Sequence, residues 1–169
     1  MKPRLPKSYE DPAGNVGWVL LAFRLPREPS TPRIAVWRKL KRLGVAQLLD
    51  GLVALPLDNR NREQLEWVAD DVTEAGGEAT IWIGTLASGA QERQLAARMR
   101  ETVAAEYRTL VEEAEAVRLQ AAGRRRRSLA RLRRELRRIR LRDYFAPEER
   151  ELAKQAVEEL AASFEEVTS

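Results

Sequence analysis

Arginine is the residue type in this sequence whose number and spacing point most directly to a chemical role. Residues 124–142, RRRRSLARLRRELRRIRLR, contain eleven arginines and one acid, Glu135, so their formal charge is 11 − 1 = +10. The guanidinium group is planar, permanently charged and able to donate two hydrogen bonds to one oxyanion. We therefore predict that this segment binds DNA phosphates. The predicted contacts are Arg124, Arg125, Arg126, Arg127, Arg131, Arg134 and Arg138, with Arg142 at the end of the segment.

Four apolar residues indicate that this segment is a packed helix rather than a plain basic tail. They recur at spacings of three, four and three, which places them on one helical face: Leu129, Leu132, Leu136 and Ile139. Two interpretations stay open. Either the arginines bind an anion, or ion pairs with Glu113, Glu115 and the glutamates of the last predicted helix neutralise a solvated face. Because that last helix is acidic, we expect the arginines facing away from it, near Arg124–Arg127, to be free.

A second basic surface is predicted on an earlier helix. Ser30–Thr31 offers an N-cap, Pro32 suits the first helical position, and Gly44 suits the C-cap. The residues expected to face inward are Ile34, Trp37, Leu40 and Leu43. The outward face has no acid, and four of its residues join the predicted DNA contacts: Arg33, Arg38, Lys41 and Arg42.

The composition excludes several kinds of chemistry. The 169 residues include no cysteine and no histidine, which removes disulfides, imidazole catalysis and the usual zinc sites. The acids Asp70 and Asp71 are adjacent on a predicted helix and point in different directions, so they form a poor metal pair. We expect a protein that is not an enzyme and needs no cofactor or metal. Without a signal peptide or spanning segment, we expect it to be cytoplasmic.

The elements before residue 88 alternate between strand and helix. Strands are predicted at 16–25, 45–57 and 78–86, and helices at 32–43 and 60–75. Asp50-Gly51 favours a hairpin within 45–57, although a single bulged strand is the alternative. Asn59 is the expected cap of the second helix. Its buried side is predicted to hold Leu65, Val68 and Val72, and the position of Trp67 stays open. This order is the split βαβ of ferredoxin-like folds, with both helices on one face of an antiparallel sheet.

The rest of the chain is predicted to be helical. Helix 90–122 carries an apolar stripe that ends at Ala121, Gly123 separates it from the arginine helix, and Pro147 opens a last helix, 148–166. The residues expected to face inward on the last helix are Leu152, Ala156, Leu160 and Phe164. The fold class is therefore α+β: a leader at 1–15 expected to be disordered, a ferredoxin-like domain at 16–87, and a helical bundle at 88–169. The tryptophans at 18, 37, 67 and 82 are expected to belong to the core.

The chain resembles the N-terminal region of the ChrB family, regulators of bacterial chromate-resistance operons. The resemblance rests on WVLLAFRLP, TPRIAVWRKLKRLG, AQLLDGLVALP, AEYRTLVEEA and LRRELRRIRLRDYFAPEE, and covers about residues 16–165. It implies a DNA-binding transcriptional regulator. A weaker similarity leads to the middle domain of PaaX-type repressors and, through it, to small CRISPR-associated nucleases. Those nucleases hold a metal with an acid where this chain has Arg24.

Three functional classes follow from these observations. The leading hypothesis is a DNA-binding regulator of the ChrB type, expected to be a homodimer, with chromate or sulfate as an oxyanion effector of the arginine segment. The second is a non-catalytic module that docks an acidic partner protein through the same basic helix. A metal-dependent nuclease is the least favoured, because a cation at Arg24 would repel the metal.

Overall fold

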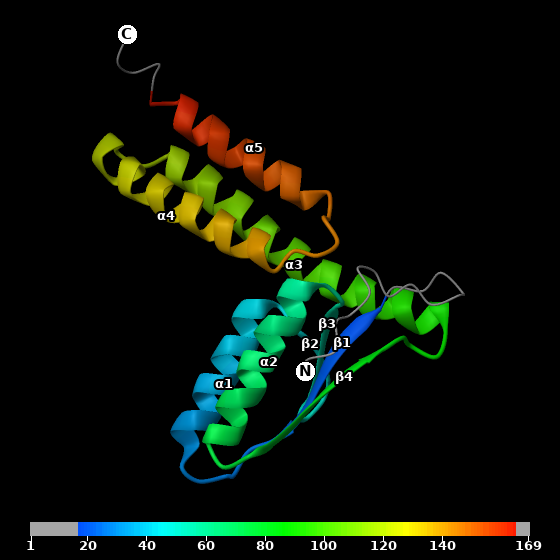
Figure 1. Ribbon diagram of the computed structural model, residues 1–169. Coiled ribbons are helices and arrows are strands. Elements are labelled where there is room, and N and C mark those ends of the chain that lie inside the picture. The colour runs from blue at the N-terminus through cyan, green and yellow to red at the C-terminus, as the bar shows by residue number, and fades with distance from the viewer. Residues whose placement is uncertain (1–16, 165–169) are drawn as a thin grey trace. The chain divides into compact units, whose positions relative to one another are not determined.

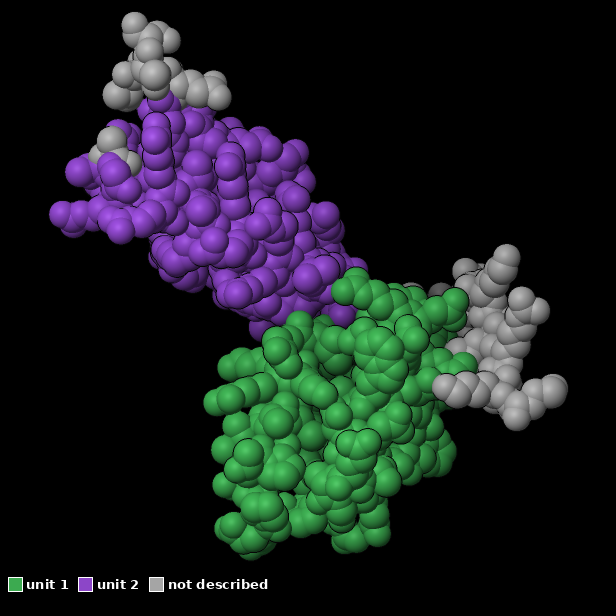
Figure 2. Space-filling view, turned by 60° about the vertical axis from the view of Figure 1, so that its left-hand side comes forward, with its two compact units in different colours: residues 1–96 green, residues 97–169 purple. Residues whose placement is uncertain are grey.

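The computed structural model describes residues 17–164, so the leader predicted at 1–15 lies outside the described residues. The chain divides into two compact units, one ending at Ala96 and the other beginning at Ala97. Figure 2 shows the two units in separate colours. The division falls inside one long helix. Each unit has its own apolar core and is described by itself.

The first unit is a four-stranded antiparallel sheet with two helices on one of its faces (Figure 1). The strands run in the order β2-β3-β1-β4, so the first and third strands lie at the centre. This is the strand order of the split βαβ fold, and it confirms the predicted α+β ferredoxin-like class. The elements are β1 (Trp18–Arg24), α1 (Ser30–Leu43), β2 (Ala46–Leu49), β3 (Leu52–Pro56), α2 (Asn59–Glu74) and β4 (Glu78–Gly84).

The predicted hairpin between β2 and β3 is confirmed, with Asp50-Gly51 as its turn. Gly51 has a φ of +79°, a conformation that side chains with a Cβ rarely adopt. Its carbonyl oxygen accepts a hydrogen bond of 2.7 Å from the backbone N–H of Phe23, at the end of β1. The turn is therefore fixed against the central strand rather than free in solvent.

The helix starts in this unit differ from the predictions by one or two residues. The N-cap of α1 is Pro29, with no side-chain cap, instead of Ser30–Thr31. The N-cap of α2 is Asp58 instead of Asn59, because the Asp58 carboxylate accepts a hydrogen bond of 2.6 Å from the N–H of Asn61. At the other end of α1, Gly44 is the left-handed C-cap that the sequence predicted.

The buried face of α1 was predicted with an error. Val36 and Leu40 are buried, whereas Ile34 is 49% exposed. Residues two positions apart lie about 200° apart around a helix, so burying Val36 turns Ile34 toward solvent. On α2 the prediction is confirmed, because Leu65, Val68 and Val72 are all buried.

The expectation that the tryptophans form the core was right for only part of the set. Trp18 is buried and Trp37 is half-buried, but Trp67 and Trp82 are 55% and 60% exposed. Trp82 pairs with Leu20 across the sheet. That pair lies on the face opposite Phe23, which contacts Trp37 of α1. The Trp82 side chain thus points away from α1 and α2.

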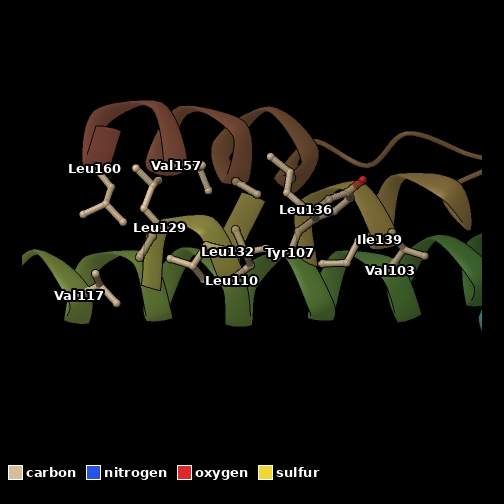
Figure 3. Packing of buried hydrophobic residues seen from close by; sticks show 12 residues of the cluster. Val103, Tyr107, Leu110, Val117, Leu129, Leu132, Leu136, Ile139, Val157 and Leu160 are labelled. Atoms are coloured by element: carbon tan, nitrogen blue, oxygen red, sulfur yellow. The ribbon is translucent and has the colours of Figure 1, made fainter. Parts of the chain in front are cut away.

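The second unit contains most of α3 (Gly89–Arg118) together with α4 (Ala122–Leu141) and α5 (Glu149–Ala162). The three helices share one apolar core, in which Tyr107, Leu132 and Leu160 are fully buried. In Figure 3 the apolar residues of α4 lie among those of α3 and α5. The stripe predicted on the arginine helix is confirmed, since all four of its members are buried: Leu129, Leu132, Leu136 and Ile139.

Three details of the helical unit differ from the predictions. Helix α3 ends at Arg118, and Gly123 lies in the first turn of α4 instead of separating the two helices. Ala121 is exposed because it precedes α4 as its N-cap. On α5, Leu152 is 57% exposed, because its buried residues follow a different stripe with spacings of four and three: Ala153, Val157 and Leu160.

Candidate nucleic-acid interface

Burial of the α4 stripe fixes the direction in which each arginine of that helix points. With four apolar residues in the core, most of the remaining helix surface is left to guanidinium groups. Three arginines are half-buried at the margins of the core: Arg125, Arg140 and Arg142. The exposed ones are Arg124, Arg126, Arg127, Arg131, Arg133, Arg134, Arg137 and Arg138.

Acids from α3 neutralise one side of α4. Arg131 pairs with Glu113 at 2.8 Å, and Arg142 pairs with Glu106. The Arg142 guanidinium donates hydrogen bonds to the Glu106 carboxylate, and these bonds raise the pKa of Arg142 above its usual value. Within α4 itself, Glu135 lies 3.4 Å from Arg138. Three of the predicted phosphate contacts, Arg131, Arg138 and Arg142, therefore already have carboxylate partners.

The glutamates of α5 have other partners. Glu149 pairs with Arg108 at 2.8 Å and Glu159 with Arg118 at 3.5 Å, both on α3, while Glu151 pairs with Lys154 on α5 itself. Within residues 17–164, no arginine of α4 forms an ion pair with a glutamate of α5. The carboxylates that neutralise α4 come from α3 and from Glu135.

Five arginines on the remaining side form what we call the arginine face: Arg126, Arg127, Arg133, Arg134 and Arg137. All five are exposed, and none has a carboxylate partner among the described residues. Their spacings of seven, four and three keep them on one side of the helix. From Arg126 to Arg137 the row extends about 16 Å along the helix axis. The charge on this face is left for an external anion.

The arginine face differs from the predicted set in its membership. Arg133 and Arg137 were not among the predicted contacts, although a seven-residue step from Arg126 and a further step of four would have found them. Arg124 is exposed and has no ion pair in the described part of the chain. Arg125 instead lies over the Phe164 ring, with 5.4 Å between the guanidinium carbon and the ring centroid.

The exposed side of α1 carries a second basic surface, the first-helix face, made of Arg33, Arg38, Lys41 and Arg42. These four predicted contacts are exposed, and no ion pair joins them to another described residue. Lys39, on the same helix, pairs with Asp71 of α2. A shallow groove of about 300 Å³ runs between Arg33, Arg38 and Lys41, with Ile34 and Trp37 as its apolar floor. Cationic and aromatic groups thus meet on one surface of the first unit.

Three further features of the described residues bear on metal binding, on Arg24 and on membrane insertion. Within residues 17–164, no group of three or more acidic side chains gathers in a way that could hold a metal ion. Arg24, at the end of β1, pairs with Glu78 at 2.9 Å on the exposed surface. Over the same residues, no helix combines the length and apolar character needed to cross a membrane.

Comparisons with known proteins relate most of these elements to one family. A family model described as the N-terminal region of protein ChrB matches residues 33–122. Protein ChrB of Cupriavidus metallidurans is 30% identical over 110 residues, which is 65% of this chain and 29% of that relative. The aligned part therefore spans less than a third of the relative's length. No solved structure matches the chain.

The matched range has a consequence for the two basic surfaces. It begins inside α1 and ends at the first residue of α4. The first-helix face thus lies within the matched residues, while the arginine face lies beyond them. The arginine face is therefore defined by its own geometry and charge alone.

Proposed function

The chain belongs to the family of ChrB N-terminal regions, and from this membership we propose that it is a DNA-binding transcriptional regulator of the chromate-resistance type. The observation that carries the proposal is the arginine face, five exposed guanidinium groups without carboxylate partners in the described chain. Duplex DNA offers a dense row of negative charge, about one per 1.7 Å of its axis. A rigid row of arginines about 16 Å long matches such a polyanion.

The physical basis of this binding is the release of counterions from DNA. Each phosphate that a guanidinium group neutralises lowers the slope of log affinity against log salt by about 0.9. If all five residues of the arginine face contact phosphates, they account for a slope of about −4.5. The first-helix face would add to this term in a complex that engages both units. Phosphate contacts of this kind fix position on the duplex and leave base recognition to other groups.

A mobility-shift titration with the promoter duplex of the chain's own operon, at several salt concentrations, tests the proposal. Arg134→Ala and Arg131→Ala form a matched pair, because both residues are exposed on α4 but only Arg131 has a carboxylate partner, Glu113. We expect Arg134→Ala to reduce the salt slope by about one and to weaken binding severalfold. Arg131→Ala should change both quantities less, because its charge is already balanced.

Two results would count against this function. Equal effects of Arg131→Ala and Arg134→Ala would mean that the lack of a carboxylate partner does not define the contact surface. Affinity for DNA that is absent, or independent of salt, would remove the function itself. Equal competition by polyglutamate would favour the alternative, an interaction module that docks an acidic protein partner.

We include homodimerisation in the proposal. The sheet face opposite α1 and α2 carries Leu20, Ala54 and Trp82, which lie side by side in the strand register. On the same face, at the outer strand β2, Leu49 is 68% exposed, and Trp82 on the other outer strand is 60% exposed. A second copy packed on this face would remove the exposed side chains of Leu49 and Trp82 from water. Sedimentation of wild type and Trp82→Ser at equal concentrations tests this, and dimers of equal strength in both would exclude Trp82 from the interface.

An oxyanion effector is the last part of the proposal. Chromate and sulfate are doubly charged tetrahedral anions that arginine can bind through paired hydrogen bonds. If such an anion occupies the arginine face, it should compete with DNA in the shift assay. Chloride of equal ionic strength is the control. If chromate leaves the shift as unchanged as chloride does, the effector does not bind the arginine face.

A further inference from the structure

The first unit contains a cavity in which only one lining residue, Arg33, belongs to the proposed DNA contacts. Its volume is about 370 Å³, and it lies where β1 ends, beside α1 and the β2–β3 turn. The groups that matter for its chemistry are three arginines, two aromatic rings and one acid: Arg24, Arg27, Arg33, Phe23, Trp37 and Asp50. All of them belong to one compact unit, so the cavity does not depend on the placement of the helical unit.

Backbone geometry holds the turn that forms one wall of this cavity. Gly51 adopts a φ of +79°, and a Cβ atom added to it would lie 2.3 Å from the carbonyl oxygen of Phe23. Only glycine allows this close approach. The N–H of Phe23 in turn donates to the Gly51 carbonyl at 2.7 Å. Asp50 is therefore presented beside the end of β1 by a turn with little freedom to move.

The charges in the cavity are unbalanced. Arg27 and Arg33 have no ion pair with any described residue, and Arg24 pairs with Glu78 only on the exposed surface. Asp50 accepts one long hydrogen bond, 3.4 Å from the side-chain amide nitrogen of Gln47. Three arginines and a single carboxylate thus line the cavity, and an anion is the ligand that this imbalance favours.

The other wall is aromatic. The rings of Phe23 and Trp37 lie 5.5 Å apart between centroids, at 58° to each other, which is a normal tilted contact. Trp37 is only half-buried and lines the cavity, so part of its ring is available to a planar ligand. Flat π-systems such as nucleobases stack on exposed aromatic rings.

From these features we infer that the cavity binds a nucleoside phosphate. Its phosphate would lie against Arg27 and Arg33, its base against Trp37, and the carboxylate of Asp50 would accept from an N–H group of the base. The volume supports an organic ligand, because cavities for such ligands start at about 300 Å³. An inorganic oxyanion alone would leave the aromatic wall without a partner. This site is separate from the arginine face and does not rest on duplex binding.

The ligand has two natural sources with the same chemistry, a free nucleotide and an unpaired nucleotide of a nucleic-acid strand. Calorimetric titration of the full chain with GMP, AMP, guanosine, pyrophosphate and a short single-stranded oligonucleotide distinguishes them. We expect GMP or AMP to bind at least about tenfold more tightly than guanosine or pyrophosphate, because each of the latter lacks one half of the recognised group. An oligonucleotide that binds more tightly than both mononucleotides, and that loses this advantage in Arg33→Ala but keeps it in Arg134→Ala, would identify a strand as the source.

Variants localise the binding. Arg33→Ala should weaken nucleotide binding about tenfold, the effect of losing one charge-assisted hydrogen bond. Arg27→Ala, in the exposed segment before α1, should act in the same direction with little effect on folding. Arg60→Ala removes an equal charge from the exposed start of α2 and should leave binding unchanged. Arg134→Ala, on the arginine face, should also leave it unchanged.

Any of three results would overturn the inference. The first is that the folded chain does not bind GMP or AMP at millimolar concentration. The others are that pyrophosphate binds as tightly as the nucleotides, or that Arg60→Ala weakens binding as much as Arg33→Ala. Because Arg134→Ala is expected to weaken DNA binding alone, failure of the nucleotide site and failure of the proposed function are distinguishable.

Discussion

Replacing Tyr107 by phenylalanine removes one hydroxyl group from the core of the helical unit and leaves the ring in place. Tyr107 is fully buried on α3, and its hydroxyl donates a hydrogen bond of 2.9 Å to Asp143, which follows α4. The Asp143 side chain is only 1% exposed. Its other oxygen accepts from the backbone N–H of Ala146 at 2.8 Å, and Arg150 lies 3.7 Å away. The variant therefore leaves a buried carboxylate with one donor fewer.

The magnitude follows from the kind of bond that is lost. A hydrogen bond to a charged group contributes about 1.5–3 kcal/mol to stability, and the retained ring avoids a cavity term. We expect the free energy of unfolding to fall by about this amount in Tyr107→Phe at neutral pH. The hydroxyl links α3 to the turn between α4 and α5, so its loss should loosen the unit that carries the arginine face.

The same bond predicts how stability depends on pH. Burial, and then the hydrogen bond to Asp143, raise the pKa of Tyr107 well above its ordinary value of 10.0. The folded state therefore keeps this proton where the unfolded state has lost it. The stabilisation is fully present below about pH 10 and declines as pH rises further, by up to about 1.4 kcal/mol for each pH unit. Tyr107→Phe has no such proton and should lack this decline.

Urea unfolding followed by circular dichroism, for wild type and Tyr107→Phe from about pH 8 to about pH 11, measures both effects. The difference between the two proteins cancels other groups that titrate in this range. We expect it to be constant up to about pH 10 and to shrink above it. Equal stability at pH 8, or a difference that does not change with pH, would refute the role given to the hydroxyl.

Three further predictions concern stability alone. Leu132→Ala should lower the free energy of unfolding by about 2–5 kcal/mol, because the Leu132 side chain is fully buried. Leu141 is 57% exposed, so Leu141→Ala should change the free energy of unfolding little. Similar losses in both variants would mean that the two faces of α4 are misassigned. Asp58 is the N-cap of α2, so Asp58→Ala should lower the free energy of unfolding by about 1 kcal/mol, and Asn59→Ala should lower it clearly less. A larger loss in Asn59→Ala would instead identify Asn59 as the cap. Gly51→Ala should lower the thermal midpoint of unfolding, because its φ is +79° and a Cβ would lie 2.3 Å from a carbonyl oxygen; an unchanged midpoint would show that the turn relaxes freely.

Local patterns in the sequence were sufficient for the order of the elements. The alternation of short apolar runs with helical stripes predicted the ferredoxin-like unit, and Asp50-Gly51 predicted its hairpin. The reason is that a strand repeats every two residues and a helix every 3.6, so each pattern identifies its own element. The four-residue stripe of α4 predicted its buried face for the same reason.

Details that depend on one or two residues were predicted less well. Ile34 and Val36 on α1, and Leu152 and Ala153 on α5, are close in sequence and all apolar, so periodicity alone chose the wrong member of each pair. Trp82 satisfied the strand pattern, yet the sheet turns it away from α1 and α2. In each case the neighbouring elements decide which apolar side chain is buried.

The sequence by itself determined that α4 is a basic helix with one apolar face, because its composition and spacing are properties of the helix alone. Only the tertiary structure decided which of its arginines lack a carboxylate partner. Arg131 and Arg134 are alike in sequence, but α3 brings Glu113 to one and no described carboxylate to the other. The nucleotide cavity is likewise invisible in the sequence, since its walls come from residues 23–27, 33–37 and 50–51. Helical period sets the direction of a side chain, while the charges around it come from segments far away in the chain.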